Sequence, residues 1–177
     1  MNMGNDYPNN ELNYNFFETM ENKNDEYLVF FNEHTHFFII PNTNKRETQK
    51  YSVIDRQLLD RYGKRTINIE LKIRTKHINF YNGVFIEPKK WEALKKDYQE
   101  KGIIPLYINF FQTHDNVIIF DLRQWFDKNI TPQNEYVNII NKGYHRIDKK
   151  ELRYKLPQRD GFFYEFDQEQ QKYTRKW

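Results

Sequence analysis

Three residues of this chain could together carry out chemistry: Asp55, Glu70 and Lys72. Two carboxylates held close together repel each other unless a cation lies between them, and a hard divalent ion such as Mg²⁺ prefers oxygen ligands of this kind. A water molecule bound to that ion has a lowered pKa and can become a nucleophile. A lysine beside the ion could orient or deprotonate this water and neutralise charge that develops on a phosphate. These residue types favour metal-assisted hydrolysis if the fold brings them together.

The segment Thr66–Arg74 sets the direction of two of these side chains. It alternates polar and apolar residues without a break, which predicts a half-buried β-strand. Four apolar side chains would face one side of this strand: Ile67, Ile69, Leu71 and Ile73. Glu70 and Lys72 would therefore point the same way from the opposite face.

A hairpin would bring Asp55 to the same place. Residues 51–59 read as a second strand, and Arg61–Lys64 reads as the turn between it and Thr66–Arg74. If the chain turns between residues 62 and 63, the numbers of cross-strand partners sum to 125, so Asp55 lies opposite Glu70. Directly opposed side chains have Cβ atoms about 4.5–5.5 Å apart. A loop of odd length would move every partner by one residue and weaken this pairing.

The rest of the pattern predicts an α/β or α+β fold with a mixed central β-sheet flanked by helices. Pro88 is suited to the first turn of a helix that Gly102 ends. The other expected elements are a helix at Glu11–Met20, strands at Tyr27–Phe31, His36–Ile40, Ile103–Phe111 and Val117–Leu122, and a basic helix at Lys149–Lys155. We expect one domain over residues 1–125, with residues 126–177 as a C-terminal extension that packs on it or trails from it.

Composition excludes several classes of protein. The 177 residues contain no cysteine, which rules out disulfides and thiolate metal sites. The start of the chain is polar and lacks the apolar run of a signal peptide, and no stretch reaches the roughly 20 apolar residues of a membrane helix. We therefore expect a soluble protein of the cytoplasm with no membrane partner. The net charge of +3 is too small for indiscriminate nucleic-acid binding, so such binding would need a local basic patch.

Asp55 followed fifteen residues later by Glu70-Leu71-Lys72 resembles the signature of the PD-(D/E)xK nuclease superfamily. Ile54 stands where that signature often has proline. The similarity extends over roughly residues 11–122, in the family order of a helix, a three-stranded meander that carries the motif, a second helix and a further strand. The segment Phe85–Trp91 also looks like phage-encoded and resolvase-like members.

The resemblance implies a restriction-endonuclease-like core of αβββαβ order and Mg²⁺- or Mn²⁺-dependent cleavage of DNA phosphodiesters, by an endonuclease or an exonuclease. It implies that Lys72 is the catalytic lysine and that the metal ligands are Asp55, Glu70 and the backbone carbonyl of Leu71. Many members add a glutamate from the first helix. Glu18 and Glu11 are both candidates, and we favour Glu18 because it is nearer the part of that helix expected to pack.

We expect four basic side chains to contact the DNA backbone: Arg74, Lys76, Lys89 and Lys90. The first two continue the motif strand, and the last two lie at a helix N-terminus, where backbone N–H groups favour anions. A solvated helix face is the alternative for the lysines of that helix. A second basic cluster touches DNA or solvates a helix: Lys149, Lys150, Arg153 and Lys155.

The expected role is recombination, repair or genome processing in a bacterium or a phage, in the host cytoplasm if the protein is phage-encoded. Cutting both strands commonly calls for two active sites, which suggests a homodimer. The alternative is a catalytically inactive copy of the fold that binds nucleic acid or another protein.

Overall fold

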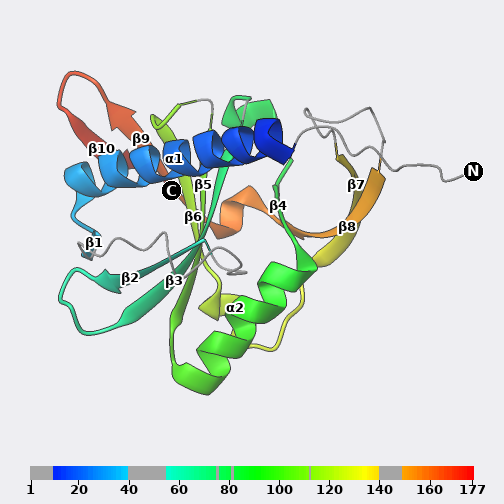
Figure 1. Ribbon diagram of the computed structural model, residues 1–177. Coiled ribbons are helices and arrows are strands. Elements are labelled where there is room, and N and C mark those ends of the chain that lie inside the picture. The colour runs from blue at the N-terminus through cyan, green and yellow to red at the C-terminus, as the bar shows by residue number, and fades with distance from the viewer. Residues whose placement is uncertain (1–9, 40–54, 75, 81, 112, 140–148) are drawn as a thin grey trace, which may run out of the picture.

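The computed structural model describes residues 10–39, 55–74, 76–80, 82–111, 113–139 and 149–177 (Figure 1). The helices are α1 (Asn10–Thr35), α2 (Pro88–Lys101) and α3 (Arg123–Phe126), with short 3₁₀ turns at Ile78–Phe80 and Gln158–Asp160. The strands are β1 (Phe38–Ile39), β2 (Arg56–Asp60), β3 (Thr66–Arg74), β4 (Val84–Ile86), β5 (Ile104–Phe111), β6 (Asn116–Asp121), β7 (Gln133–Ile139), β8 (Lys149–Leu156), β9 (Phe162–Asp167) and β10 (Lys172–Arg175).

A seven-stranded sheet runs through the molecule in the order β1-β2-β3-β5-β6-β9-β10. Strands β3 and β5 pair in parallel and the other neighbours pair antiparallel, so the sheet is mixed. The predicted α+β class with a mixed central sheet is confirmed. Strands β9 and β10 come from the segment after residue 125, and they extend this sheet beyond β6. The predicted boundary between a domain and a C-terminal extension at residue 125 stays a prediction. Strand β4 does not belong to the main sheet; it pairs with β8 in a separate three-stranded sheet of order β4-β8-β7.

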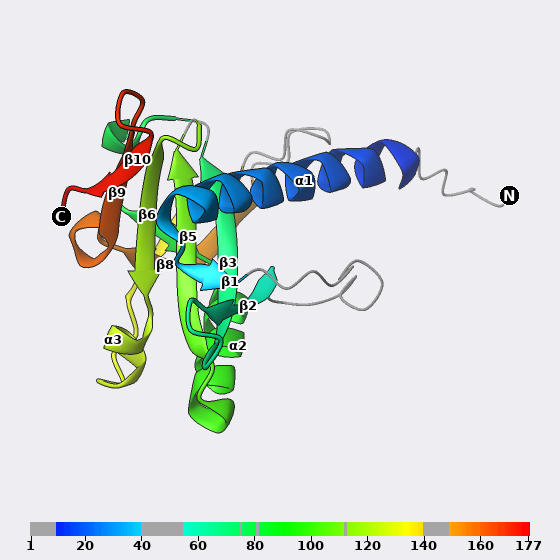
Figure 2. The same cartoon turned by 90° about the vertical axis from the view of Figure 1, so that its left-hand side faces the viewer.

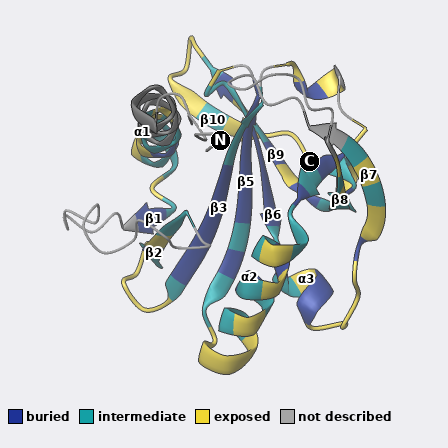
Figure 3. Ribbon diagram, turned by 45° about the vertical axis from the view of Figure 1, so that its right-hand side comes forward, coloured by how far each residue is buried: buried dark blue, intermediate teal, exposed yellow. Residues whose placement is uncertain are grey.

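The two long helices cover opposite faces of the main sheet (Figure 2). Side chains of α1 pack in one apolar cluster with Ile69, Ile108 and Val117, while Trp91 and Leu94 of α2 belong to the other cluster. Strand residues alternate between the two clusters, as the period of two requires. Strands β3, β5 and β6 are consequently buried along most of their length (Figure 3).

Helix α1 is much longer than the predicted Glu11–Met20, since it runs for 26 residues from Asn10 to Thr35. The predicted strand at Tyr27–Phe31 was wrong because this aromatic run also has helical spacing. Tyr27 packs edge-on to Phe110 of β5 at 5.5 Å, and Phe31, four residues on, is fully buried. Of the predicted strand His36–Ile40, only Phe38–Ile39 is described as a strand, and residue 40 lies outside the described residues.

Helix α2 confirms the prediction at both ends. Pro88 occupies its first turn, and Gly102 ends it with φ of 67°, a left-handed conformation that glycine adopts without a Cβ clash. The Gly102 N–H donates to the carbonyl of Tyr98 at 2.9 Å. Trp91 and Leu94 are each 1% exposed, so α2 is fixed against the sheet by large apolar side chains.

The segment expected to form a basic helix, Lys149–Lys155, is instead part of strand β8. It pairs with β4 on one side and β7 on the other. Its side chains alternate: Tyr154 packs edge-on to Trp91 at 5.6 Å and Leu156 is fully buried, whereas Arg153 faces the other way. The long-range strand partners and the buried alternate side chains favour a strand over a helix here.

Candidate active site

The β2–β3 hairpin has the predicted register. Arg56 pairs with Ile69 and Leu58 pairs with Ile67. The Asp60 N–H donates to the Arg65 carbonyl at 2.8 Å and closes the ladder at the turn. The numbers of paired residues sum to 125, as predicted. Asp55, which directly precedes β2, therefore lies at the end of the ladder next to Glu70 and Leu71.

The Asp55 carboxylate is bound to the backbone of the motif strand. Its Oδ2 accepts a hydrogen bond from the Leu71 N–H at 2.7 Å. The N–H and C=O groups of one strand residue point to the same edge, so the Leu71 carbonyl lies on the edge that faces Asp55. The predicted carboxylate and the predicted carbonyl ligand therefore lie side by side.

Glu70 is far more buried than a half-exposed strand face implies. It is 1% exposed, because β5 lies alongside β3 and α2 covers this face. From Ile67 to Leu71 the strand is buried on both faces, so the half-buried prediction was wrong for this part of β3. Burial raises the pKa of the Glu70 carboxyl from 4.5 to about 7, and the Asp55 charge adds to the rise, while Lys72 and Lys90 oppose it.

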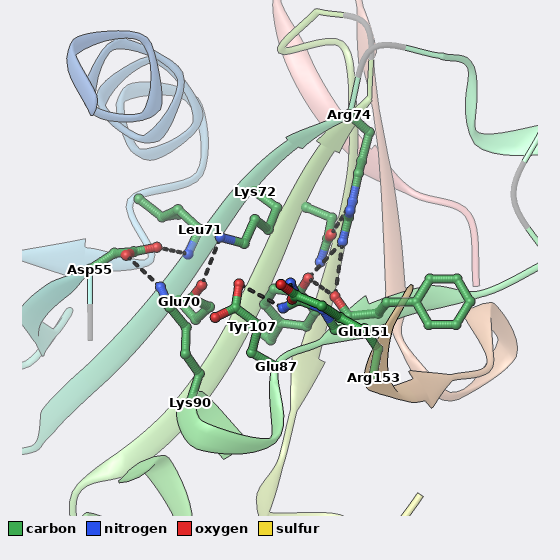
Figure 4. Close-up of polar contacts among 12 residues, drawn as sticks. Asp55, Glu70, Leu71, Lys72, Arg74, Glu87, Lys90, Tyr107, Glu151 and Arg153 are labelled. Atoms are coloured by element: carbon green, nitrogen blue, oxygen red, sulfur yellow. Dashed lines mark hydrogen bonds and ion pairs between the residues drawn. The ribbon is translucent and has the colours of Figure 1, made fainter. Parts of the chain in front are cut away.

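Lys90 bridges the two carboxylates (Figure 4). Its Nζ donates to Glu70 Oε2 at 2.6 Å and to Asp55 Oδ1 at 3.0 Å. Burial alone would lower the pKa of Lys90, but the charges of Glu70 and Asp55 raise it above its ordinary value. The sequence predicted that this lysine contacts DNA; the structure shows it paired with the two acids.

Lys72 lies on the other side of the Glu70 carboxylate. Its Nζ is 3.1 Å from Glu70 Oε1, which makes an ion pair. The approach does not have the angles of a hydrogen bond, since this buried oxygen has no hydrogen-bond donor in the described part of the chain. The Lys72 side chain is 35% exposed, so its ammonium is both next to the acid and open to solvent.

Further along the same face, Arg74 is drawn inward rather than toward solvent. Its Nε donates to Asn109 Oδ1 at 3.0 Å, and its Nη2 donates to the Tyr107 hydroxyl at 2.7 Å and to the Phe85 carbonyl at 3.2 Å. The Tyr107 hydroxyl in turn donates to that carbonyl at 2.7 Å. Burial raises the pKa of Tyr107 to about 12, so the phenol stays neutral. Arg74 thus ties β3 and β5 to β4.

Sequence reasoning missed Tyr107 and Asn109. In the parallel β3–β5 register Tyr107 lies next to Glu70 and Asn109 lies next to Lys72. The polar side chains at these two alternate positions of Ile103–Phe111 could have indicated this, but only if the pairing of the two strands had been known. The sequence also left the role of Arg153 open. This residue lies beside Arg74 and Tyr107 (Figure 4). Arg153 pairs with Glu87 at 2.6 Å, and burial together with the charge of Arg74 lowers its pKa.

The other predicted residues are exposed side chains or lie outside the residues whose side chains are described. Lys76 and Lys89 are exposed, and their contact with DNA stays a prediction. The side chains of residues 10–21 are not described, so the role of Glu18, or of Glu11, also stays a prediction.

Two features are absent from the described residues. Among the described residues, no group of three or more histidine, cysteine, aspartate or glutamate side chains is arranged to hold a metal ion. Asp55 and Glu70 supply two carboxylates, and any further ligand would be a backbone carbonyl, water or an undescribed side chain. No helix within the described ranges is long and apolar enough to cross a membrane.

Comparisons of this chain with family models, with curated proteins and with solved structures found no match.

Proposed function

We propose that this protein is a Mg²⁺- or Mn²⁺-dependent nuclease of the PD-(D/E)xK type that hydrolyses DNA phosphodiester bonds. The observation that carries the proposal is the convergence of Asp55, Glu70 and Lys72 on one face of the central sheet, in the register expected from the sequence. An aspartate, a glutamate and a lysine meet there, and none of them belongs to either apolar cluster of the core.

The order of elements supports a restriction-endonuclease-like core. Helix α1 precedes the antiparallel meander β1-β2-β3, and after α2 the strand β5 returns parallel to β3. Apart from β4, this order is compatible with the αβββαβ order that the resemblance implies, with the motif on β3. Strand β4, which joins the three-stranded sheet between β3 and α2, is an addition to that order.

The residues present fit a divalent cation. Asp55 and Glu70 already point at one cationic centre, the Lys90 ammonium, and Glu70 Oε1 is a buried oxygen with no hydrogen-bond donor among the described residues. Asp55, Glu70 and the Leu71 carbonyl would hold the ion, which would lower the pKa of a bound water and polarise a phosphate oxygen.

The side chains around the carboxylates suit the rest of the reaction. Lys72 is next to Glu70 yet open to solvent, so it can orient the attacking water or hold its proton. Arg74 and Arg153 lie near the carboxylates, but Arg153 is paired with Glu87 and Glu151 and Arg74 is bonded to Asn109, the Phe85 carbonyl and the Tyr107 hydroxyl, so both arginines support the framework of the site (Figure 4). Recombination, repair or genome processing in a bacterium or a phage would use such an activity.

One observation favours a second candidate, a catalytically inactive copy of the fold that binds nucleic acid or a protein. Lys72 and Lys90 together already offset the charges of the two carboxylates, so the fold does not need a metal to offset their repulsion. A titration separates the two candidates: DNA that raises the melting temperature, while neither Mg²⁺ nor Mn²⁺ does, would favour the inactive form.

The test of the nuclease proposal is a cleavage panel of duplex, single-stranded and branched DNA and of RNA, each with Mn²⁺, Mg²⁺ or EDTA. Glu70→Gln and Lys72→Met should each lower metal-dependent cleavage at least about a hundredfold, the usual scale for losing a group that acts on the reacting water. Lys96→Met removes an exposed lysine of α2 and should keep the parent rate. Cleavage by both site variants at the parent rate would refute the proposal.

A further inference from the structure

The charges at the carboxylate pair balance without any metal ion. Asp55 and Glu70 are paired with Lys72 and Lys90, all within 3.1 Å of a partner. The two lysines differ in position: Lys90 contacts both acids, while Lys72 contacts Glu70 alone. Lys90 is also the more enclosed, with 18% of its side chain exposed against 35% for Lys72.

The Lys90 ammonium lies where an ion held by both acids would lie. A divalent ion of the Mg²⁺ class needs carboxylate oxygens at about 2.0–2.1 Å, and Lys90 donates to the same two carboxylates. Two cations at one pair of carboxylates repel each other, most strongly beside Glu70, which is 1% exposed. Metal binding and the present position of Lys90 therefore exclude each other.

Lys90 can leave the carboxylates without disturbing the fold. It lies in the first turn of α2, and the neighbouring Trp91 and Leu94 hold that helix against the sheet. A change of side-chain rotamers is enough to move the ammonium toward solvent, because lysine carries its charge on a flexible four-carbon chain. The backbone ligand at Leu71 and the two acids would stay in place.

We propose that Lys90 is an internal counter-ion that pairs the two acids in the metal-free protein and is displaced when a divalent cation binds. The affinity of the site for metal is then set by competition with this ammonium group. The inference rests on the proposed function, since it takes Asp55 and Glu70 to be metal ligands. It assigns Lys90 a role in controlling metal binding, in place of the DNA contact expected from the sequence.

The test is direct titration of the metal-free protein with Mn²⁺ by isothermal calorimetry at fixed pH and ionic strength. Lys90→Gln and Lys90→Met should each lower the Kd for Mn²⁺ at least about tenfold, which corresponds to about 1.4 kcal/mol of binding free energy. Lys96→Gln removes the same charge from an exposed position of the same helix and should leave the Kd unchanged. Circular dichroism checks that each variant is folded, and the methionine variant preserves the length of the aliphatic chain.

The outcomes separate the inference from the proposed function. If the parent binds Mn²⁺, Glu70→Gln abolishes that binding, and neither Lys90 variant binds more tightly, the inference is overturned and the metal site stands. Weaker binding in the Lys90 variants would overturn it too, because the lysine would then assist the metal. If neither the parent nor any folded Lys90 variant binds Mn²⁺, the metal site and the inference both fail.

Discussion

The burial of Glu70 predicts that the metal-free protein loses stability as the pH rises from about 4.5 to about 7. The pKa of this carboxyl is raised from 4.5 to about 7, first by burial and then by the Asp55 charge. In that pH range the folded protein holds a proton that the unfolded chain has released. The contribution of Glu70 to stability is therefore fully present below pH 4.5 and is lost as the pH rises through 7.

The size of the effect follows from the two pKa values. At about 1.4 kcal/mol for each pH unit, the interval from 4.5 to about 7 corresponds to about 3 kcal/mol of unfolding free energy. For a chain of this length, 1 kcal/mol shifts the melting temperature by roughly 2–4 °C. The melting temperature of the metal-free protein should thus fall by roughly 6–12 °C from this group alone.

The assay is thermal unfolding in EDTA between pH 4.5 and pH 8, for the parent and for Glu70→Gln. Other groups titrate in both proteins, so the difference between the two curves isolates Glu70. Glu100→Gln, at an exposed position of α2, is the matched control and should follow the parent. Parallel curves for the parent and Glu70→Gln would refute the reasoning, since the buried carboxyl would then have no unusual proton affinity.

Divalent metal should reverse this dependence, because the ion binds the ionised carboxylate and competes with the proton. Saturating Mn²⁺ should raise the melting temperature of the parent more at pH 8 than at pH 5, and should have little effect on Glu70→Gln. An equal rise at both pH values would show that the ion binds elsewhere.

Three substitutions test the framework around the site by chemical or thermal unfolding. Arg74→Met removes the donor to Asn109 and to the Tyr107 hydroxyl and should lower the free energy of unfolding by about 2–3 kcal/mol. The loss should appear as a lower urea midpoint at unchanged slope. An unchanged midpoint would mean that Arg74 does not stabilise the contact between these strands. Gly161→Ala places a Cβ 2.5 Å from a methyl group of Ile118 and should cost about 1–3 kcal/mol, measured as a lower melting temperature. Trp91→Ala removes the fully buried ring that holds α2 and should cost about 3–5 kcal/mol, with a loss of near-ultraviolet circular dichroism.

The hairpin and α2 could be predicted because their determinants are local. The register of β2 against β3 depends on the length of one turn and on the alternation within Thr66–Arg74. The ends of α2 depend on a proline and a glycine that act on their own backbone. The hairpin register alone was enough to predict that Asp55 lies near Glu70.

Two elements were predicted wrongly because distant partners determine them. Residues 27–31 suit a strand or a helix, and packing against the sheet selects the helix. Residues 149–155 contain good helix formers, but hydrogen bonds to β4 and β7 make them a strand. Local propensity is a weak preference that tertiary contacts override.

The sequence by itself determined which acids meet, and the tertiary structure decided what surrounds them. Lys90 lies 35 residues after Asp55 in the chain, and no local spacing rule relates the two. Its ammonium reaches the carboxylates because Trp91 and Leu94 fix α2 over β3, which also excludes water from Glu70 and raises its pKa. Burial and charge depend on every element packed around a group, so they arise only when the whole fold is formed.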